Sequence, residues 1–531
     1  MKIVGIFACV AFAGWTLAAE ASVRLAAPFT DGVVLQRERP VPVWGTSDPG
    51  LAVTVSFGGQ TESTTVDATG RWRVDLKPMT ACREGRDLIV TSSPAPIDQS
   101  NHQGYSIEQS NNPNNRTILH DVLVGEVWIC SGQSNMEFPL CGKMTRFRDR
   151  QGALVAQMTR KPLVRFANVS SYKGAAEETT EPFRPCVWRT ATPENLAQDD
   201  AFSAVGIYYA LELHSALEVP IGIIGAYWGG TRAEPWIPRC GFESVPSLKA
   251  EAAYRPLMGA AFTNVHLLAS CPTYGEYHQK PHQQPSVLWN AQLAPLVPFA
   301  VRGMIWYQGE SNSADYARYA DMMQALWNGW SKKFENPDLP LYFAQIAPYG
   351  WAKTLPEIQA AQTKFVRQEP HAAMAVINDL GNEFNEIHPN EKELVAKRLA
   401  VHALKRDYGF DWIQDESPVL TASKVEGSRC VLTFGNAKSL HYYNKNPKEP
   451  CGGFEIAGAD GVWKPAFIDK DCLDAPSVPF VGGLKTTTIS VSAEGVANPA
   501  KLRYLHSKPW RGALYNEADL PLGSFAVDLN L

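Results

Sequence analysis

The stretch GEVWICSGQSNM, residues 125–136, joins an unbroken apolar run to a small polar turn. Val127–Cys130 has the continuous hydrophobicity of a strand buried on both faces, rather than the alternation of a half-exposed strand. The run stops at the polar cluster Ser131–Asn135. In a parallel sheet, functional residues lie beyond the carboxyl ends of the strands, so this cluster marks a candidate site.

Four further apolar runs downstream repeat this pattern. Each stops at a small or polar cluster, and helical patterns such as Tyr316–Phe334 and Glu391–Tyr408 lie between them. The four runs are Ile221–Tyr227, Gly303–Tyr307, Leu341–Ile346 and Ala372–Ile377. Buried strands that alternate with helices predict an α/β fold, in which helices cover both faces of a parallel sheet.

The regions on either side of this core have a different, β-like texture. Short runs such as Val53–Phe57 and Trp72–Leu76 precede the core, and Cys430–Phe434 and Thr486–Val491 follow it. We therefore predict β-rich N-terminal and C-terminal domains around the α/β core. The predicted divisions are a signal peptide over 1–21, a β-sandwich-like domain over 22–118, the α/β domain over 119–408 and a β-rich domain over 409–531.

The first residues have the pattern of a secretory signal peptide. Lys2 precedes the apolar run Ile3–Leu17, and Ala19-Glu20-Ala21 offers a small-x-small cleavage site. The run is too short for a comfortable membrane span. A net charge of −5 gives no basic surface for nucleic acid or anionic lipid. We expect a secreted or periplasmic protein with neither nucleic acid nor membrane as a partner.

Ser134 is the candidate nucleophile. A serine at a sharp turn from strand to helix exposes its hydroxyl, and the backbone N–H groups that follow can face a developing oxyanion. The segment lacks the second glycine of the Gly-x-Ser-x-Gly elbow, so the usual α/β-hydrolase fold is not indicated. The alternative is that Ser134 only caps the next helix.

Three other polar clusters, at the ends of the predicted strands or just after them, contain the groups that such a nucleophile needs. The paired glycines Gly229 and Gly230 let backbone N–H groups approach a ligand. Gln308 can donate its side-chain amide to an oxyanion, and His388 can act as general base. Each cluster alone has an ordinary reading, as a tight turn, a solvated loop or a structural histidine. Their shared position favours a serine hydrolase site.

These segments resemble the sialate O-acetylesterase family of the Ser-Gly-Asn-His hydrolase superfamily. The resemblance runs in order through nearly the whole mature chain, and its most specific segments are Ser131–Met136 and Trp306–Asn312. Other matching segments are Val34–Arg37, Trp44-Gly45, Gly125–Trp128, Trp228–Thr231, Val287–Asn290, Ile387–Pro389, Lys392, Arg398, Leu399, Leu514–Asn516 and Leu520-Pro521. The resemblance implies a flavodoxin-like parallel-sheet core of the superfamily type.

The resemblance also implies an activity. It is hydrolysis of O-acetyl groups from sugars, most naturally O-acetylated sialic acids, through an acetyl-Ser134 intermediate and without a metal or other cofactor. The oxyanion hole would consist of the N–H of Ser134, an N–H of Gly229 or Gly230, and Gln308. The alternatives are an esterase that acts on acetylated xylan or xyloglucan, and a non-catalytic carbohydrate-binding protein.

The group that orients His388 is less clear from the sequence. Many members of the superfamily have Asp three residues before the histidine, where this chain has Asn385. Members of the family often have Asp two residues before it, where this chain has Glu386. Glu386 is therefore the first choice for the third triad member. A backbone carbonyl is the alternative, which would leave a Ser-His dyad.

Five residues are assigned to substrate binding: Gln133, Asn135, Arg232, Asn290 and Glu310. Arg232 directly follows the Gly-Gly-Thr segment, and its guanidinium could pair with the carboxylate of a sialic acid. The alternative is an ordinary surface charge. Glu310 could hold substrate hydroxyls or orient a neighbouring side chain.

Overall fold

The computed structural model describes residues 23–94, 115–140, 163–198, 202–253, 261–263, 281–349, 353–380, 386–443, 452–474, 481–506 and 514–529. The predicted signal peptide and Asn385 lie outside these ranges. The chain divides into two compact units. The N-terminal unit comprises Met1–Leu25, Val43–Asp75 and Leu88–Ile118, and the main unit comprises Ala26–Pro42, Leu76–Asp87 and Leu119–Leu531.

Antiparallel strands form the N-terminal unit. One sheet contains β1 (Arg24–Leu25), β3 (Val41–Thr46) and β6 (Arg71–Leu76). In another, β4 (Leu51–Phe57) pairs with β5 (Gln60–Thr65) and β7 (Cys82–Pro94). The turn between β4 and β5 is Gly58-Gly59, and both glycines have positive φ (59° and 81°), as a tight two-residue hairpin requires. Alternate residues of β4 and β6 are buried, which is the period of a strand with one core face.

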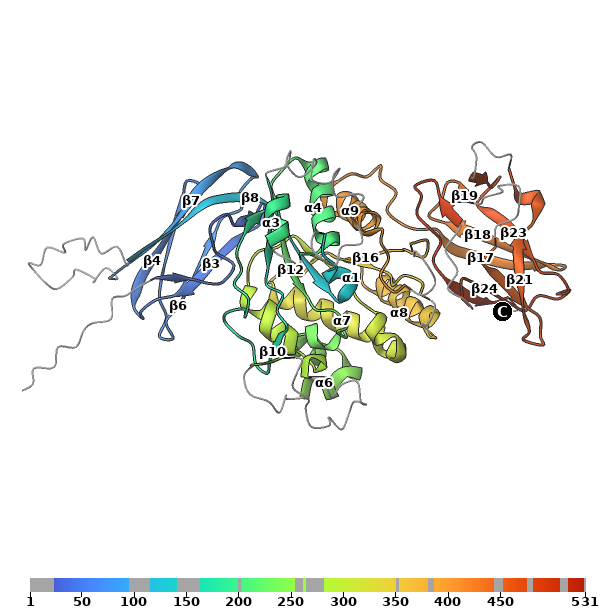
Figure 1. Ribbon diagram of the computed structural model, residues 1–531, viewed down its shortest axis with the longest axis horizontal. Helices are drawn as coiled ribbons and strands as arrows, with labels where there is room; N and C mark the ends of the chain where they lie inside the picture. Colours follow the sequence, from blue (N-terminus) through green and yellow to red (C-terminus); the bar gives the residue numbers. More distant parts are fainter. Residues whose placement is uncertain are drawn as a thin grey trace, which may run out of the picture. The chain divides into compact units, whose positions relative to one another are not determined.

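A largely parallel sheet forms the centre of the main unit (Figure 1). Its strand order is β11-β9-β12-β8-β14-β15-β16, and β11 alone runs antiparallel to its neighbour along this path. The bounds are β8 (Arg116–Gly132), β9 (Val164–Asn168), β11 (Arg189–Thr190), β12 (Ile221–Tyr227), β14 (Gly303–Tyr307), β15 (Leu341–Ala344) and β16 (Ala372–Ala375), with β2 (Val34–Gln36) parallel to β8. The five apolar runs found in the sequence thus form five neighbouring strands. The sequence did not predict β9.

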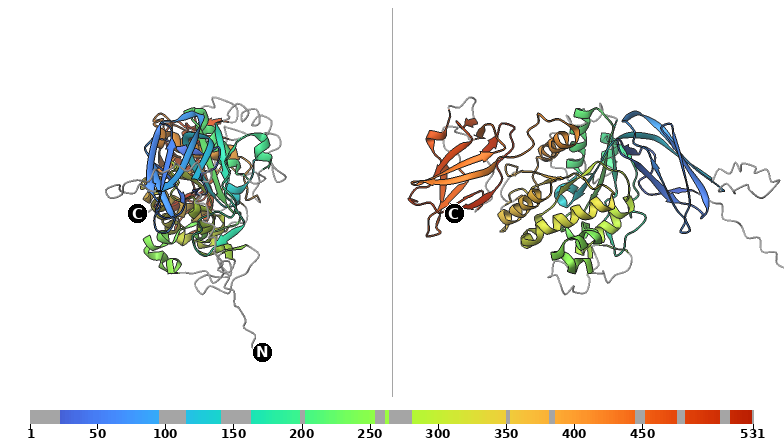
Figure 2. Two further views of the ribbon diagram at one scale, coloured as in Figure 1. Left: turned by 90° about the vertical axis from the view of Figure 1, so that its left-hand side faces the viewer. Right: turned by 180° about the vertical axis from the view of Figure 1, so that it is seen from behind.

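Helices cover both faces of this sheet (Figures 1 and 2). On one face, Trp128 and Ile305 belong to the same core cluster as α4 (Ala204–Leu217) and α9 (Lys392–Tyr408). On the other face, the Trp306 ring lies 5.7 Å from the Trp330 ring of α7 (Tyr316–Lys333). The remaining helices in this region are α1 (Ser134–Glu137), α3 (Pro193–Gln198), α5 (Arg239–Ser244), α6 (Lys249–Ala253) and α8 (Leu355–Gln368), with η8 (Glu310–Asp315) and short strands β10 (Lys173–Ala175) and β13 (Ala261–Thr263).

Local sequence explains where the two long helices of the first face begin or end. α4 begins after Ser203, whose hydroxyl accepts the N–H of Gly206 at 3.0 Å as an N-cap. α9 ends at Gly409, which adopts the left-handed conformation (φ 74°) that terminates many helices. α9 starts four residues after His388, so its first residue, Lys392, lies near that histidine in the chain.

The C-terminal region consists of antiparallel strands around a separate core. A seven-stranded sheet has the order β17-β18-β23-β21-β20-β24-β26, and a three-stranded sheet has the order β22-β19-β25. The strands are β17 (Val419–Glu426), β18 (Arg429–Gly435), β19 (Leu440–Tyr443), β20 (Phe454–Ala457), β21 (Trp463–Ile468), β22 (Val481–Gly483), β23 (Thr488–Ser492), β24 (Lys501–Tyr504), β25 (Leu514–Asn516) and β26 (Phe525–Asp528). The residues of this core include Leu432, Ile456 and Leu502.

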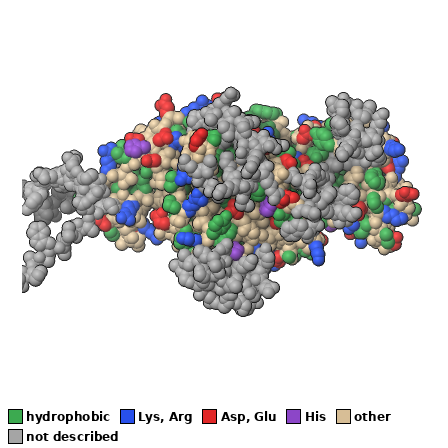
Figure 3. Space-filling model, viewed as in Figure 1, with side chains coloured by type: hydrophobic (Ala, Val, Ile, Leu, Met, Phe, Trp, Pro, Cys, Tyr) green, Lys and Arg blue, Asp and Glu red, His purple; other side chains and the backbone are tan. Residues whose placement is uncertain are grey.

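Charges of both signs are interspersed on the face that Figure 3 shows. Lys and Arg side chains lie among Asp and Glu side chains rather than in one large field. Among the described residues, no helix is long and apolar enough to cross a membrane.

Candidate active site

Ser134 lies just beyond the carboxyl end of β8, on a turn that requires glycine. Gly132 has φ 142°, and a Cβ atom there would lie 2.2 Å from the carbonyl oxygen of Tyr307. Ser134 is the first residue of α1, and the N-cap position before it is Gln133, whose side chain makes no capping hydrogen bond. The Ser134 hydroxyl instead lies 3.0 Å from Nε2 of His388. The helix-cap alternative is therefore not what the structure shows.

His388 lies between β16 and α9, and Glu386 orients its ring. Nδ1 of His388 is 3.2 Å from Oε1 of Glu386, and the same oxygen accepts the backbone N–H of His388 at 3.0 Å. A carboxylate can only accept, so Nδ1 carries the proton and Nε2 has a lone pair for the Ser134 hydroxyl. Phe138 packs beside the imidazole, with ring centroids 5.6 Å apart. The geometry is that of a Ser-His-acid triad. The Glu386 carboxylate lies next to Nδ1, where the dyad alternative would have a backbone carbonyl.

Gly229, after β12, places a backbone N–H beside Ser134. A Cβ on Gly229 would lie 3.4 Å from the Cβ of Ser134. The Gly229 N–H donates to Oε2 of Glu137 at 2.6 Å, and the other oxygen of Glu137 accepts the hydroxyl of Tyr172 at 2.6 Å. The N–H groups of Ser134 and Gly230 have no hydrogen-bond partner within the described ranges. One predicted oxyanion donor, the N–H of Gly229, thus already donates to a carboxylate oxygen of Glu137.

The side chain of Gln308 makes its hydrogen bonds within the protein. It is fully buried, and its amide nitrogen lies 3.1 Å from Oε1 of Gln133, 3.2 Å from the carbonyl oxygen of Thr231 and 2.7 Å from Oδ1 of Asn312. Its oxygen accepts the hydroxyl of Tyr319 at 3.0 Å. The amide N–H groups are donated inside the protein here, and the role of Gln308 as an oxyanion donor stays a prediction. Gln308 braces the loops that follow β12 and β14.

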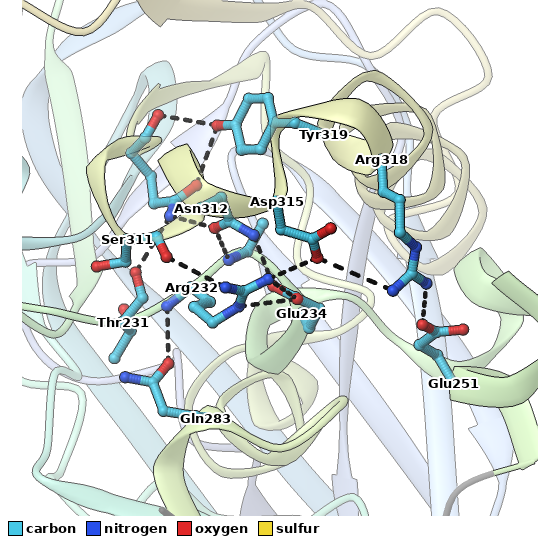
Figure 4. Close-up of polar contacts among 12 residues, drawn as sticks. Thr231, Arg232, Glu234, Glu251, Gln283, Ser311, Asn312, Asp315, Arg318 and Tyr319 are labelled. Atoms are coloured by element: carbon cyan, nitrogen blue, oxygen red, sulfur yellow. Dashed lines mark hydrogen bonds and ion pairs between the residues drawn. The ribbon is translucent and has the colours of Figure 1, made fainter. Parts of the chain in front are cut away.

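Arg232 also belongs to this brace (Figure 4). Its guanidinium donates to Oε1 of Glu234 at 2.9 and 2.8 Å and to Asp315 at 2.8 Å. Asn312 accepts the N–H of Ala233 at 3.0 Å and donates to Oε2 of Glu234 at 3.0 Å. Burial opposes the charge, but the two carboxylates raise the pKa of Arg232 above its ordinary value. Two carboxylates of the protein thus already neutralise the charge of Arg232, and its pairing with a substrate carboxylate stays a prediction.

The other four residues assigned to substrate binding are also buried. Gln133, Asn135, Asn290 and Glu310 are all at most 8% exposed. Oε1 of Gln133 accepts the N–H groups of Gly309 at 3.4 Å and Ser311 at 3.3 Å, in addition to its contact with Gln308. Nδ2 of Asn290 donates to the carbonyl oxygens of Ala175 and Ala176 at 3.0 Å each. These side chains hold the walls of the site together rather than line its surface.

Asn135 and Glu310 form a buried polar cluster with Lys392, which the sequence reading noted only as a match to the family. Nδ2 of Asn135 donates to Oε1 of Glu310 at 2.6 Å and to the carbonyl oxygen of Ile387 at 3.1 Å. Nζ of Lys392 donates to Oδ1 of Asn135. One signal could have found Lys392: a cation at the first position of a helix is unfavourable unless other groups require it. Within the described ranges, no three His, Cys, Asp or Glu side chains converge as a metal site would require.

Comparisons with known proteins agree with this geometry. A family model described as "Carbohydrate esterase, sialic acid-specific acetylesterase" matches residues 273–405, which include β14 and His388. The sialate O-acetylesterase of Mus musculus is 30% identical over 488 residues, which cover 84% of each chain. The chain belongs to the sialate O-acetylesterase family. The family member from Rattus norvegicus is 29% identical over 486 residues, again 84% of each chain.

One solved structure resembles this family member over almost its whole length. It is a carbohydrate acetylesterase from Xanthomonas citri, 28% identical in sequence, with a TM-score of 0.75 over 95% of this chain and 99% of that one. Membership of the sialate O-acetylesterase family makes the chain a carbohydrate esterase of the acetylesterase class. The sequence resemblance to this family is thereby confirmed.

Proposed function

We propose that this protein removes O-acetyl groups from sugars, with O-acetylated sialic acids as the first substrate class and Ser134 as the nucleophile. The observation that carries the proposal is the 3.0 Å contact between the Ser134 hydroxyl and Nε2 of His388, whose other nitrogen faces Glu386. The named sialate O-acetylesterases of rat and mouse support the substrate class.

The first half-reaction forms an acetyl-enzyme. His388 takes the hydroxyl proton of Ser134 as the serine oxygen bonds to the acetyl carbonyl carbon. The carbonyl oxygen becomes an oxyanion, which the N–H groups of Ser134 and Gly229 stabilise. This requires the Glu137 carboxylate to leave the N–H of Gly229, where it now lies at 2.6 Å. The bond from carbon to the sugar oxygen then breaks, and His388 returns its proton to that oxygen.

The second half-reaction restores the enzyme. Water attacks the acetyl-Ser134 carbonyl while His388 accepts one of its protons, and the same donors stabilise the second oxyanion. The bond to the serine oxygen breaks, His388 protonates that oxygen, and acetate leaves. Glu386 stabilises the imidazolium that forms in each half and keeps Nε2 directed at Ser134.

A second substrate class, acetylated neutral polysaccharide such as xylan or xyloglucan, is favoured by one observation. The carboxylate of Glu137 lies against Gly229, beside the nucleophile, and Arg232 is already neutralised by Glu234 and Asp315. A carboxylate at this position repels the carboxylate of a sialic acid and has no such effect on a neutral sugar.

Hydrolysis of p-nitrophenyl acetate by wild type and Ser134→Ala tests the reaction. We expect the wild type to be active and Ser134→Ala to lose at least about a thousandfold in kcat, because the nucleophile is removed. Ser423→Ala, on an exposed position of β17, is the matched control and should retain wild-type kcat. An inactive wild type would exclude the esterase proposal, and an active Ser134→Ala would exclude this nucleophile.

A substrate panel separates the two substrate classes. O-acetylated sialic acids, acetylated xylan and acetylated xyloglucan should be compared by release of acetate with purified wild type. Sialic acids should give the highest kcat/KM if the first class is correct. A preference for the neutral polysaccharides, lost on Glu137→Ala, would instead establish the second class.

The domain divisions and export also remain our proposals. The three-part division over 22–118, 119–408 and 409–531 is supported by separate hydrophobic clusters in the last two parts and by the antiparallel strands of the first. In the core, the parallel strands have the order β9-β12-β8-β14-β15-β16, and without the outer strand β9 the other five follow the order 2-1-3-4-5 in chain sequence, which supports a flavodoxin-like sheet. Export rests on the pattern of residues 2–21.

A further inference from the structure

We propose that Lys392 is a positioning residue of this site, which holds Asn135 so that a single amide ties the nucleophile segment to the histidine segment. Lys392 donates its hydrogen bond to Asn135 rather than to Ser134 or His388, so it acts through its neighbour. The inference rests on the proposed function, because it assigns Ser134 and His388 the roles described above.

The amide of Asn135 joins two parts of the chain that are far apart in sequence. Asn135 directly follows Ser134, and its Nδ2 donates at 3.1 Å to the carbonyl oxygen of Ile387, the residue before His388. The same nitrogen donates at 2.6 Å to Glu310, at the start of η8. The separation between Ser134 and Nε2 of His388 therefore depends on where this amide lies.

Lys392 determines which way the amide of Asn135 faces. An ammonium group has only donors, whereas Glu310 and the Ile387 carbonyl offer only acceptors here. With Lys392 donating to Oδ1, the NH2 group of Asn135 must face Glu310 and Ile387. Without the ammonium group, Oδ1 is a buried acceptor without its donor, and the amide is held only through its NH2 group.

The position of Lys392 is unfavourable for a charge. The residue is 1% exposed and is the first residue of α9, where the helix dipole disfavours a cation. Burial lowers the pKa of Lys392 to about 7, although Glu310, Glu391 and Glu386 act in the opposite direction. Burial likewise raises the pKa of Glu310. Apolar residues in place of such a buried pair are often as stabilising, so stability alone does not account for the lysine.

Two aromatic rings lie near the ammonium group of Lys392. Nζ lies 5.2 Å from the ring centroid of Tyr307, the last residue of β14, and 5.7 Å from that of Phe138, which follows α1. Phe138 packs in turn beside the imidazole of His388. The ammonium group thus lies near Phe138, which follows the helix that carries Ser134 and packs beside the imidazole of His388.

The test compares Lys392→Met with Lys397→Met in the full chain. Lys397 lies on the same helix, is half-exposed and pairs with Glu393 at 2.8 Å, so it is the matched control. We expect Lys392→Met to lower kcat for p-nitrophenyl acetate by about 10- to 100-fold with KM changed less than about threefold, because misplacement of reacting groups affects the chemical step. The rate of covalent inactivation by a fluorophosphonate, which reads the nucleophile directly, should fall in parallel.

A double-mutant cycle with Asn135→Ala distinguishes positioning from a general loss of structure. If Lys392 acts through Asn135, the double variant should lose no more kcat than the worse single variant. Asn135→Asp is the second test, because it keeps an acceptor for Lys392 but has no N–H for the Ile387 carbonyl, and it should lose activity as Asn135→Ala does. All assays are run well below the unfolding midpoint of the least stable variant.

Several outcomes would overturn the inference. They are a kcat of Lys392→Met equal to that of Lys397→Met, losses that multiply in the double variant, and full activity of Asn135→Asp. If Lys392→Met fails to fold, Asn135→Asp decides the matter alone. Failure of the proposed function would look different, because Ser134→Ala would then retain the activity of the wild type.

Discussion

One oxygen of the Glu386 carboxylate accepts two N–H groups of His388. Oε1 accepts both Nδ1–H and the backbone N–H of His388, at 3.2 and 3.0 Å, and the Glu386 side chain is 23% exposed. Glu386→Ala removes the group that selects the tautomer with a free Nε2 lone pair and stabilises the imidazolium. We expect kcat for p-nitrophenyl acetate to fall by at least about a hundredfold with little change in KM.

Glu393→Ala is the control for Glu386→Ala. Glu393 lies in the first turn of α9 and pairs with Lys397, away from the histidine ring. Its loss should leave kcat within about twofold of wild type, since exposed ion pairs of this kind contribute little. A loss of only a few-fold in Glu386→Ala would mean that a backbone carbonyl is sufficient to orient His388, and would favour the dyad.

At the scale of elements, Arg232 joins the loop after β12 to the loop after β14. Its partner Glu234 is fully buried, and Asp315 is the second carboxylate (Figure 4). Arg232→Met leaves the buried Glu234 without its counter-charge, so we expect the free energy of unfolding to fall by about 3–5 kcal/mol. The folded variant should bind O-acetylated sialic acids and neutral acetylated sugars with KM values changed by the same factor. Chemical denaturation and steady-state kinetics measure these two effects.

Arg239→Met provides the comparison for Arg232→Met. Arg239 is the first residue of α5 and is only partly buried. Its replacement should change the unfolding free energy by less than about 0.5 kcal/mol. A selective rise in KM for sialic acids in Arg232→Met, at unchanged stability, would contradict the structural role and support the sequence-based prediction of carboxylate binding.

The strands were predictable because each is a continuous apolar run that ends abruptly. Ile221–Tyr227 and Gly303–Tyr307 are strands with the predicted bounds, while β15 and β16 end two residues earlier than the apolar runs. β9 was missed because Val164–Asn168 is short and contains Arg165, which looks too polar for a buried strand. In the structure, two nitrogens of the Arg165 guanidinium donate to Asp121: Nη2 to its carboxylate at 2.8 Å, and Nη1 to its carbonyl oxygen at 2.6 Å.

The contact between the proposed nucleophile and the proposed base was predictable, but the side chains that support it were not. Ser134 and His388 stand at strand ends or just after them, and sheet topology brings such ends together. The directions of polar side chains depend on contacts that no local pattern encodes. Asn135 meets Ile387 across 252 residues, and Gln308 meets Gln133 across 175. The residues assigned to substrate binding are therefore buried and hydrogen-bonded within the protein, which their sequence does not reveal, and Glu137 was not singled out.

At the scale of the whole molecule, tryptophan fluorescence can report unfolding of the main unit. Trp128, Trp236, Trp289, Trp306 and Trp330 are all fully buried around the central sheet. Their fluorescence should therefore report loss of this core more than loss of the β-rich regions. This fluorescence can therefore be used to follow a change in unfolding free energy that originates at the active site.

The pH dependence of that stability should contain a contribution from Lys392. Its pKa is lowered from 10.5 to about 7 in the folded protein, so between these values the unfolded chain binds one more proton at this residue than the folded chain. Stability linked to Lys392 therefore rises as the pH increases from 7 towards 10.5, and is lost as the pH falls back to 7.

Lys392→Met should abolish this contribution. We expect the free energy of unfolding, measured by denaturant titration with Trp fluorescence, to rise from pH 7 to pH 10 in wild type relative to Lys392→Met, by up to about 1.4 kcal/mol for each pH unit. Other ionisable groups are common to both proteins and cancel in the difference. Lys397→Met, where the lysine is half-exposed, should show no such difference from wild type. If wild type and Lys392→Met change in parallel over this range, Lys392 does not lose its proton near pH 7, and its ammonium group stays charged throughout the working range of the enzyme.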